Sequence, residues 1–346
     1  MTVIKTLDGL KKYREIIELF FGEYGKIYLQ NYLSFEANFK SKKKNTFWIF
    51  IDNDNQLLSA FEKKSDSVWQ CSIPGYPILG KGRYEAEVLV NFLSEVCKLL
   101  KIKTLYLPLV YKENKYLPDL LATKWIYSWS RLPSPIIRGD LTESTIWERV
   151  QSRYGSRARR QKKKFENRLY IKTIKIDEVE KIVEKIETNS WKRNYKQDML
   201  SRDNQFEYYT NIIKSGLADI SVAFDQKTEE AVAFRIDSLT GGVLFVLKWS
   251  YDEKYTDCSP GFYLLTVDLF RKYSKKQPQY IDLYGSPDML KDLLETDRLE
   301  RVDICYSTNP NEVEIIRDER TKFDEKIFIN YKKQKSIKGL FYEKQN

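Results

Sequence analysis

The 346-residue chain contains no histidine. This absence excludes Ser-His and Cys-His dyads, zinc sites built on imidazole, and any histidine general base. Proton transfer at any site of this chain must therefore use other side chains, the backbone or the substrate itself.

Cysteine is also scarce, and no two cysteines form a C-x-x-C pair. The four are Cys71, Cys97, Cys258 and Cys305. So few cysteines in a chain of this length are typical of a reducing compartment, and they predict no disulfide framework. We expect buried, inert thiols, and we expect no metal site.

Long apolar runs are missing too, because charges interrupt the first 20 residues and no stretch approaches 18 apolar residues. We therefore expect a cytoplasmic protein without a membrane partner. The hydrophobic share of 42% is enough for packed cores, and 346 residues exceed the size of one core. The sequence predicts two domains, 1–140 and 141–346, joined where two prolines and a glycine interrupt residues 129–140.

The positive charge is concentrated in one short segment. The chain has 59 basic and 49 acidic residues, a net +10, and residues 152–168 hold eight basic residues and only Glu166 as an acid, a net +7. On a helix, Arg153, Arg157, Arg160 and Lys164 would share one face. The segment fits a solvated helix face, a phosphate-binding surface or a nucleic-acid surface. Aromatic residues are not interleaved with it, which disfavours single-stranded nucleic acid.

The two halves of the chain repeat one pattern: strand, tight turn, strand, strand, Pro-Gly loop, helix, strand. In the first half the elements are expected at 46–52, 57–64, 67–76, 84–101 and 104–108, and in the second at 220–225, 231–237, 242–251, 262–275 and 280–285. Further helices are expected at 141–164 and 177–190. The tail after residue 311 is left unassigned.

The loop of the second repeat is a candidate anion site. Ser259, Pro260 and Gly261 precede a predicted helix that begins at Phe262, directly after a long strand. Free backbone N–H groups at a helix start favour a pyrophosphate. The alternative is that Pro-Gly only turns the chain.

From about Leu141 to Leu294 the sequence resembles acyl-CoA-dependent N-acyltransferases of the GNAT superfamily, related to the Fem-type peptidyltransferases. The resemblance is carried by the Arg-rich segment with Arg157, Arg159 and Arg160, by S-W-K-R at 190–193, by F-E-Y-Y at 206–209, by W-S-Y-D at 249–252, by S-P-G, and by I-D-L-Y-G followed by Lys291. It implies an α/β (α+β) fold of tandem GNAT-like domains, each a mixed, mostly antiparallel sheet flanked by helices.

The resemblance also implies roles for particular residues. Backbone groups of Lys248, Trp249 and Ser250 would receive the acyl and pantetheine groups, and the segment Ser259–Phe262 would bind the pyrophosphate. The set expected to bind substrate or phosphate is Arg157, Arg160, Trp191 and Arg193. Candidate catalytic groups are Asp282, Tyr284 and Asp252, although Asp282 and Tyr284 could equally be paired inside the core. A mechanism without a side-chain base is the alternative, in which the departing thiolate takes the amine proton.

The implied function is transfer of an acyl group from acyl-CoA, as co-substrate, to the amino group of a small acceptor. The chain looks most like the enzymes that acylate nucleotide-linked amino sugars of the dTDP-4-amino-4,6-dideoxyglucose type, as in anthrose biosynthesis. Two alternatives remain: a Fem-type transferase that uses aminoacyl-tRNA, and a non-catalytic nucleic-acid-binding protein.

Overall fold

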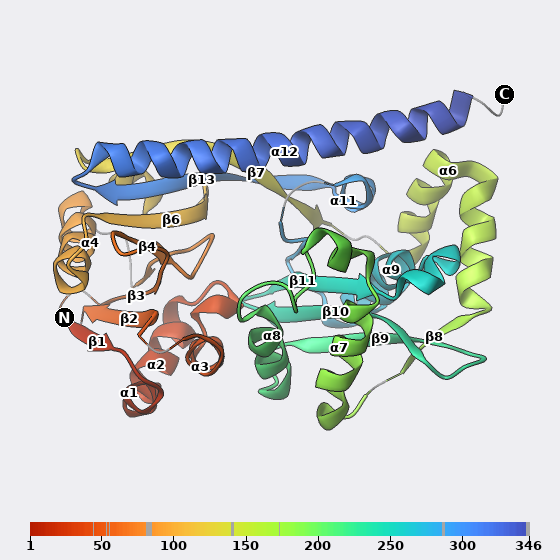
Figure 1. Ribbon diagram of the computed structural model, residues 1–346, viewed down its shortest axis with the longest axis horizontal. Coiled ribbons are helices and arrows are strands. Elements are labelled where there is room, and N and C mark those ends of the chain that lie inside the picture. Colours follow the sequence, from red (N-terminus) through yellow and green to blue (C-terminus); the bar gives the residue numbers. More distant parts are fainter. Residues whose placement is uncertain are drawn as a thin grey trace. The chain divides into compact units, whose positions relative to one another are not determined.

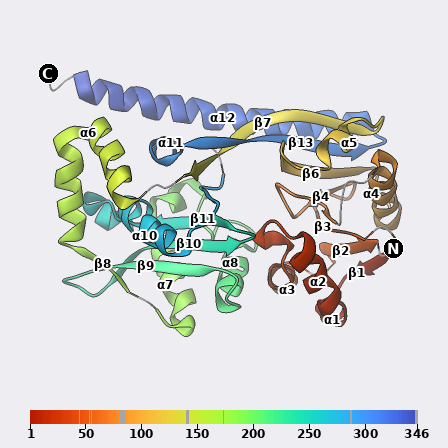
Figure 2. The ribbon, with the colours of Figure 1, turned by 180° about the vertical axis from the view of Figure 1, so that it is seen from behind.

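A computed structural model describes residues 1–43, 45–52, 54, 56–80, 85–139, 142–172, 174–285 and 288–343. The side chains of Arg157, Tyr273, Met289 and of residues from 330 onward, Lys332 excepted, lie outside this description. The chain forms two compact units. Unit 1 contains Met1–Pro135, Gly285–Asp292 and Arg298–Asn346, and unit 2 contains Ile136–Tyr284 and Leu293–Asp297. Figures 1 and 2 show their elements from opposite sides.

The sheet of unit 1 follows the order β1-β2-β3-β4-β6-β13-β7, with β5 paired to β3. Its strands are β1 (Thr2–Ile4), β2 (Phe47–Asp52), β3 (Leu57–Lys63), β4 (Val68–Cys71), β5 (Leu79–Gly80), β6 (Thr104–Tyr111), β13 (Asp297–Ser307) and β7 (Ile126–Arg138). Strand β4 runs parallel to β6, whereas β2, β3 and β4 pair antiparallel. Their aromatic and β-branched residues pack well on a pleated surface, and most of β2 and β3 is buried.

Helices cover this sheet with apolar faces. They are α1 (Leu7–Lys12), α2 (Arg14–Tyr24), η1 (Tyr28–Gln30), α3 (Tyr32–Ser41), α4 (Ala86–Leu100), α5 (Leu117–Leu121) and α12 (Pro310–Glu343). In α4 the buried residues recur at the spacing of one helix face: Leu89, Phe92, Leu93, Val96 and Cys97.

The tail that the sequence left unassigned is the helix α12, which lies along β13 and β7 (Figures 1 and 2). Asp324 of α12 receives two hydrogen bonds from Arg131 of β7, at 2.7 and 2.9 Å. Arg131 also pairs with the buried Asp303 of β13. A nearly buried ion cluster therefore holds the first half of α12 on unit 1.

The sheet of unit 2 follows the order β12-β11-β10-β9-β8, and the last three residues of β7 pair with β12. Its strands are β8 (Leu169–Lys172), β9 (Asp219–Asp225), β10 (Ala231–Thr240), β11 (Val243–Tyr251) and β12 (Tyr280–Asp282). The helical elements are α6 (Glu143–Glu166), η2 (Ile176–Glu178), α7 (Val179–Thr188), η3 (Trp191–Tyr195), α8 (Gln205–Lys214), η4 (Glu253–Cys258), α9 (Pro260–Tyr263), η5 (Leu264–Asp268) and α10 (Leu269–Lys276). Helix α11 (Met289–Leu294) follows β12.

Both units repeat the same order of elements. In unit 1, the strands β2, β3 and β4 are followed by α4 and by β6, which is parallel to β4. In unit 2, β9, β10 and β11 are followed by α9 and α10 and by β12, which is parallel to β11. The prediction of tandem α/β modules with mixed, mostly antiparallel sheets is confirmed.

The segment expected to interrupt regular structure is instead a strand of 13 residues, β7, which includes Pro133 and Pro135. This expectation was wrong. Residues 126–135 belong to the last strand in the order of unit 1, and N–H groups two residues apart point to the same side. Both missing donors therefore fall on one edge, where proline is tolerated.

Each sheet also contains strand residues that come from the other half of the sequence. Strand β13 pairs with β6 of unit 1, and Ile136–Arg138 of β7 pair with β12 of unit 2. The predicted boundary after residue 140 lies close to the passage into unit 2 at Ile136 and stays a prediction. Residues from Arg298 onward group with unit 1, which no local pattern indicated.

The predicted helix 262–275 contains a π-helical turn, η5. The fully buried guanidinium of Arg235 donates to the carbonyl of Leu264 in this turn, and to Asp237 and Asp268 at 2.8 and 2.9 Å. Burial alone would raise the pKa of Asp237, but Arg235 lowers it below its usual value. The ion cluster fixes the widened turn against β10.

The four cysteines are buried and free, as expected. Burial raises the pKa of Cys71 and Cys97 to about 12 and that of Cys258 to about 11, so these thiols are protonated at neutral pH. In the described part of the chain, no helix combines the length and apolar character that crossing a membrane requires.

Candidate active site

The strand β11 continues beyond its pairing with β12 in unit 2. It pairs with β12 only at Val243, Leu244 and Phe245, yet it continues to Tyr251. Its register with β10 shifts so that Leu247 is an extra residue, a β-bulge. The two parallel strands therefore diverge after Phe245, and one edge of residues 246–251 has no partner in β12.

The pairing of β10 and β11 tells which peptide groups face this open edge. The N–H of Asp252 donates to the carbonyl of Val232 at 2.9 Å, and hydrogen-bonded pairs alternate along an antiparallel ladder. Ser250 therefore bonds with Phe234 of β10, whereas the peptide groups of Trp249 and Tyr251 point away from β10. Of the two predicted polarising donors, Trp249 offers its N–H to the open edge and Ser250 does not.

The side chain of Ser250 also has a structural contact, since it is buried and its hydroxyl donates to Ser190 Oγ at 3.0 Å. Beside it, Lys192 of η3 donates its ammonium to the carbonyl of Trp249 and lies 4.8 Å from the centre of the Trp249 ring. The sequence analysis did not single out Lys192. Only its place in the S-W-K-R segment pointed to it.

The predicted phosphate loop lies where β11 leads into α9. Ser259 has a left-handed backbone (φ 49°), and Pro260 occupies the first turn of α9. The N–H groups of Gly261 and Phe262 therefore have no acceptor within the helix. A Cβ atom on Gly261 would lie 2.8 Å from the Trp249 ring and 3.2 Å from the Tyr251 ring. Only glycine lets the helix start approach the open strand so closely.

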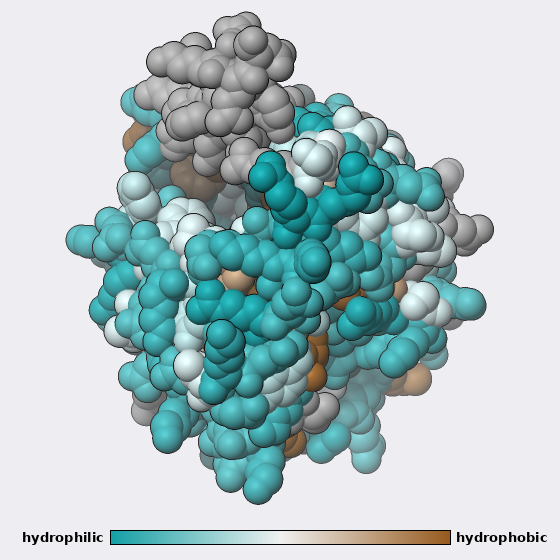
Figure 3. Space-filling model, turned by 90° about the vertical axis from the view of Figure 1, so that its right-hand side faces the viewer, coloured by the Kyte–Doolittle hydropathy of each residue, from teal (hydrophilic) through white to brown (hydrophobic). Residues whose placement is uncertain are grey.

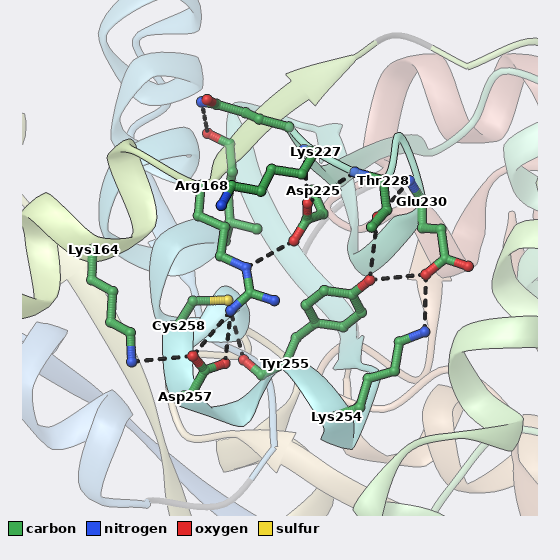
Figure 4. A network of polar contacts seen from close by, with 12 residues as sticks. Lys164, Arg168, Asp225, Lys227, Thr228, Glu230, Lys254, Tyr255, Asp257 and Cys258 are labelled. Carbon is green, nitrogen blue, oxygen red and sulfur yellow. Dashed lines mark hydrogen bonds and ion pairs between the residues drawn. The ribbon is translucent and has the colours of Figure 1, made fainter.

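A network of ion pairs fixes the loop that precedes Ser259 (Figure 4). Arg168, in the turn between α6 and β8, donates to Asp225 of β9 at 2.8 Å and to Asp257 of η4 at 3.0 Å, and its guanidinium lies 5.1 Å from the Tyr255 ring. Lys164 also pairs with Asp257, at 3.1 Å. The loop is thus bound to the turn before β8, to β9 and to the end of α6.

The same network continues to Glu230 (Figure 4). The Tyr255 hydroxyl and the Lys254 ammonium each donate to Glu230 at 2.9 Å. Hydrogen bonds from Lys254, Tyr255 and Lys185 lower the pKa of Glu230 to about 2. Glu230 therefore keeps its charge over most of the pH range.

The two predicted aspartates act as local acceptors. Asp282 is fully buried at the end of β12, and its Oδ1 accepts the N–H of Tyr284 at 2.8 Å. Asp252 is also buried, and its Oδ1 accepts the N–H of Lys254 at 3.1 Å at the start of η4. Their catalytic role stays a prediction.

Tyr284 lies where β12 ends and the strands diverge, with φ at 43°. It is close enough to Tyr209 of α8 for a charge on one phenol to be felt by the other. Burial, followed by Tyr284, raises the pKa of Tyr209 well above its usual value, so the Tyr209 phenol keeps its proton at neutral pH. The ammonium of Lys248 lies 5.4 Å from the Tyr209 ring. The sequence predicted Lys248 and Tyr284 but missed Tyr209, which appeared only in the F-E-Y-Y segment.

The basic segment does not form one continuous helix face. Gly155 interrupts α6 with a non-helical backbone (φ 53°, ψ −135°), which separates Arg153 from Arg160 and Lys164. Arg160 is exposed, Lys164 is paired with Asp257, and the side chain of Arg157 lies outside the described residues. Hydrophilic residues dominate the surface seen in Figure 3.

The remaining predicted substrate residues lie on η3. Trp191 packs edge-to-face on Tyr195, with 6.0 Å between ring centres. Arg193 donates to the buried Asp198 at 2.9 Å. The ring of Phe262 packs on Trp147 of α6 at 5.8 Å. Among the described residues, no group of three or more acidic or cysteine side chains could hold a metal ion.

In unit 1, the loop that follows β4 is hydrogen-bonded to other residues of the same unit. The carbonyl of Gly75 accepts the N–H of Tyr111 at 3.1 Å, the carbonyl of Tyr76 accepts Gln30 Nε2 at 2.9 Å, and the carbonyl of Pro77 accepts Ser59 Oγ at 2.6 Å. The segment that follows β4 therefore lies against the end of β6.

The diverging parallel strands β11 and β12, the bulge and the start of α9 all lie within a segment that matches a known family. Residues 152–292 match the family described as acetyltransferase (GNAT) domain. No curated protein sequence matches the chain.

Solved structures share the fold over nearly the whole chain. FemX is 11% identical, with 91% of this chain and all of that chain covered and a TM-score of 0.63. A conserved protein of unknown function from Bacteroides thetaiotaomicron is 11% identical (89% and 100% covered, TM-score 0.60). L-PGS from Bacillus licheniformis is 12% identical (85% and 92% covered, TM-score 0.53). At this identity the likeness concerns the fold, and these three structures do not single out the anthrose enzymes.

Proposed function

We propose that this chain is an N-acyltransferase that moves an acyl group from acyl-CoA to the amino group of a small acceptor. The observation that carries the proposal is the open edge of β11, where the N–H of Trp249 faces away from β10 beside the start of α9. The match of residues 152–292 to a GNAT domain supports the same assignment.

The reaction needs a polarised thioester carbonyl and a neutral amine. The N–H of Trp249 donates to the thioester oxygen, and the pantetheine arm extends along the edge beside Lys248 and Tyr251. The amine nitrogen forms the new bond to the acyl carbon while the carbon–sulfur bond breaks. The leaving sulfur takes the proton that the amine loses.

Tyr284 is the side chain best placed to assist, because it follows the end of β12, across from the open edge of β11. It relays the proton of the reaction: its phenol gives a proton to the leaving sulfur and takes the proton that the amine loses, with Tyr209 as its neighbour. Asp282 and Asp252 hold the backbone at the two ends of the site. Tyr284 is thus the proposed catalytic side chain, and the aspartates are positioning residues.

The donor's phosphates bind at the N–H groups of Gly261 and Phe262, beside Ser259 and Pro260. Arg160 provides positive charge for the outer phosphate groups. The acceptor is a nucleotide-linked amino sugar of the dTDP-4-amino-4,6-dideoxyglucose type, a choice that rests on the resemblance of the sequence.

The test is an assay of thiol release from acetyl-CoA and longer acyl-CoAs, with RNase-treated protein and dTDP-4-amino-4,6-dideoxyglucose as acceptor. We expect amine-dependent release of CoA and a matching amide product. The Tyr284→Phe variant should bind CoA normally but turn over slowly. Turnover that requires charged tRNA would replace this proposal by a Fem-type transferase, and tRNA binding without any transfer would indicate a nucleic-acid-binding protein.

A further inference from the structure

Arg235 of β10 lies directly opposite Trp249 of β11 in the sheet of unit 2. In an antiparallel pair, residues directly opposite each other carry their side chains on the same face of the sheet. The start of α9 covers this face, because a Cβ atom on Gly261 would lie 2.8 Å from the Trp249 ring. Arg235, the proposed polarising residue Trp249 and the helix start therefore lie on one side of the sheet.

The guanidinium of Arg235 is fully buried between this face and the helix that follows the loop. It donates to Asp237 of β10 at 2.8 Å, to Asp268 of η5 at 2.9 Å, and to the carbonyl of Leu264 in η5. Asp237 also accepts a hydrogen bond from Lys272 of α10 at 3.1 Å. Two cations and two carboxylates therefore balance one another, and they connect β10 with η5 and α10.

The helical turn that Arg235 contacts is wider than an α-helical turn. The carbonyl of Leu264 accepts the N–H of Leu269, five residues later, in addition to the guanidinium. The hydroxyl of Thr266 donates to the carbonyl of Phe262 at 2.7 Å. Hydrogen bonds of a π-helical turn span five residues instead of four. The helix start is therefore offset by about one residue, which is roughly 100° of rotation and about 1.5 Å of rise, from its place in an unbroken α-helix.

This offset determines which residue of α9 faces Trp249. Gly261 stands at the close contact, where even a Cβ atom has too little room. A shift of the helix by one residue would bring Pro260 or Phe262 to this contact, and both are larger than glycine. The same shift would turn the free N–H groups of Gly261 and Phe262 to another direction. The π-helical turn and the orientation of the predicted phosphate loop are therefore linked.

We propose that Arg235 is a positioning residue of the donor site, which holds the π-helical turn and thereby sets the register of α9 against Trp249. The inference rests on the proposed N-acyltransferase function and names the group that orients its phosphate-binding N–H groups. Arg235 touches neither substrate, since it is fully buried. A guanidinium suits this role because its planar fork bonds to a carbonyl and two carboxylates at once, whereas a single ammonium does not.

The test compares Arg235→Lys with the parent by calorimetric titration with acetyl-CoA. Lysine keeps the charge but loses hydrogen bonds of the fork, so we expect the acetyl-CoA Kd to rise about tenfold or more. The matched control is Arg131→Lys in unit 1, because the side chain of Arg131 is 6% exposed and pairs with Asp303 and Asp324 in the same way. Both substitutions should lower the melting temperature, but only Arg235→Lys should change the Kd.

A second variant, Asp268→Asn, decides the question if Arg235→Lys does not fold. It keeps the shape of the side chain and exchanges a charged hydrogen bond for a neutral one, so the acetyl-CoA Kd should rise about fivefold. A folded variant with a lower melting temperature and the parent's Kd would give the cluster a merely structural role. That result overturns the positioning role and leaves the N-acyltransferase function intact.

Hydrogen–deuterium exchange separates this inference from the proposed function, because it needs no ligand. If no acyl-CoA binds the parent, the proposed function is overturned, and exchange then decides about the turn. Faster exchange of residues 259–268 in Arg235→Lys, with parent-like exchange there in Arg131→Lys, supports the control of the helix start by Arg235. Equal exchange of this segment in the parent and in Arg235→Lys overturns it.

Discussion

The sharpest test of the donor site is the Gly261→Ala substitution. The backbone of Gly261 is not left-handed, so alanine causes no backbone strain there, and the effect is purely steric. The added Cβ would lie 2.8 Å from Trp249 Cζ3, whereas ordinary contact begins at 3.4 Å. Either the Trp249 ring or the start of α9 must therefore move by about 0.6 Å, the difference between these two distances.

Overpacking of this kind costs roughly 1–3 kcal/mol. If the helix start moves away from β11, the N–H groups of Gly261 and Phe262 no longer align with the edge at Trp249. The Kd for acetyl-CoA should then rise about 5- to 150-fold, since about 1.4 kcal/mol corresponds to tenfold. If the fold absorbs the strain instead, the melting temperature falls by roughly 2–4 °C per kcal/mol.

The assay is calorimetric titration with acetyl-CoA, together with thermal unfolding of the free protein. The matched control is Gly22→Ala in α2 of unit 1, where a Cβ would meet nothing within 4 Å. Because this glycine lies inside a helix, alanine there should stabilise by about 0.5–1 kcal/mol and leave the Kd unchanged. A Gly261→Ala protein with the parent's Kd and melting temperature would refute the close approach of α9 to β11 and the phosphate loop with it.

Four further predictions concern the same site and its support. Asp282→Asn and Asp252→Asn should each reduce kcat less than about tenfold, and the pH–rate profile should lack a base near pH ~6.5, since the chain has no histidine; a larger loss would make one of them the base. Glu230→Gln should destabilise the protein above pH 4.5, and the difference in unfolding free energy from the parent should vanish toward pH 2, because a carboxylate with a lowered pKa stabilises the fold only while it is ionised. A difference between variant and parent that is the same at pH 7 and at pH 2 would contradict the network. Titration should give one acetyl-CoA per chain, since the loop of unit 1 is closed by Gly75 and Pro77; two sites would refute this closure. Donor binding should weaken modestly between 50 and 200 mM salt, whereas a partner that neutralises 6–10 nucleic-acid phosphates would lose on the order of 10³–10⁵ in affinity.

Local patterns were sufficient for most of the strands and helices. Alternating apolar residues and the turns between them predicted β2, β3, β9, β10 and β11 within a few residues of their ends. The helical spacing of buried residues predicted α4, and the Pro-Gly pair predicted where α9 begins. These features depend on residues near one another in the chain, so a single sequence contains the information.

The sequence predicted some residues of the site and missed others. Trp249 was predicted because the resemblance placed it at a strand end, and Gly261 because the Ser-Pro-Gly loop precedes a predicted helix. Ser250 was predicted as a polarising donor, but the ladder with β10 takes its peptide groups. Lys192 and Tyr209 were missed, because a lysine on a 3-10 turn and a tyrosine on a helix carry no local sign of the strand that they contact.

The sequence by itself determined the repeated order of strands and helices, the lack of imidazole chemistry and the glycine at the helix start, because each follows from residue type and near spacing. The tertiary structure alone decided three other matters. Strand β13 returns to β6, β7 runs through two prolines, and β11 diverges from β12 after three residues. Each of these depends on pairing between segments far apart in the chain, where the hydrogen-bond partner, and not the local pattern, selects the structure.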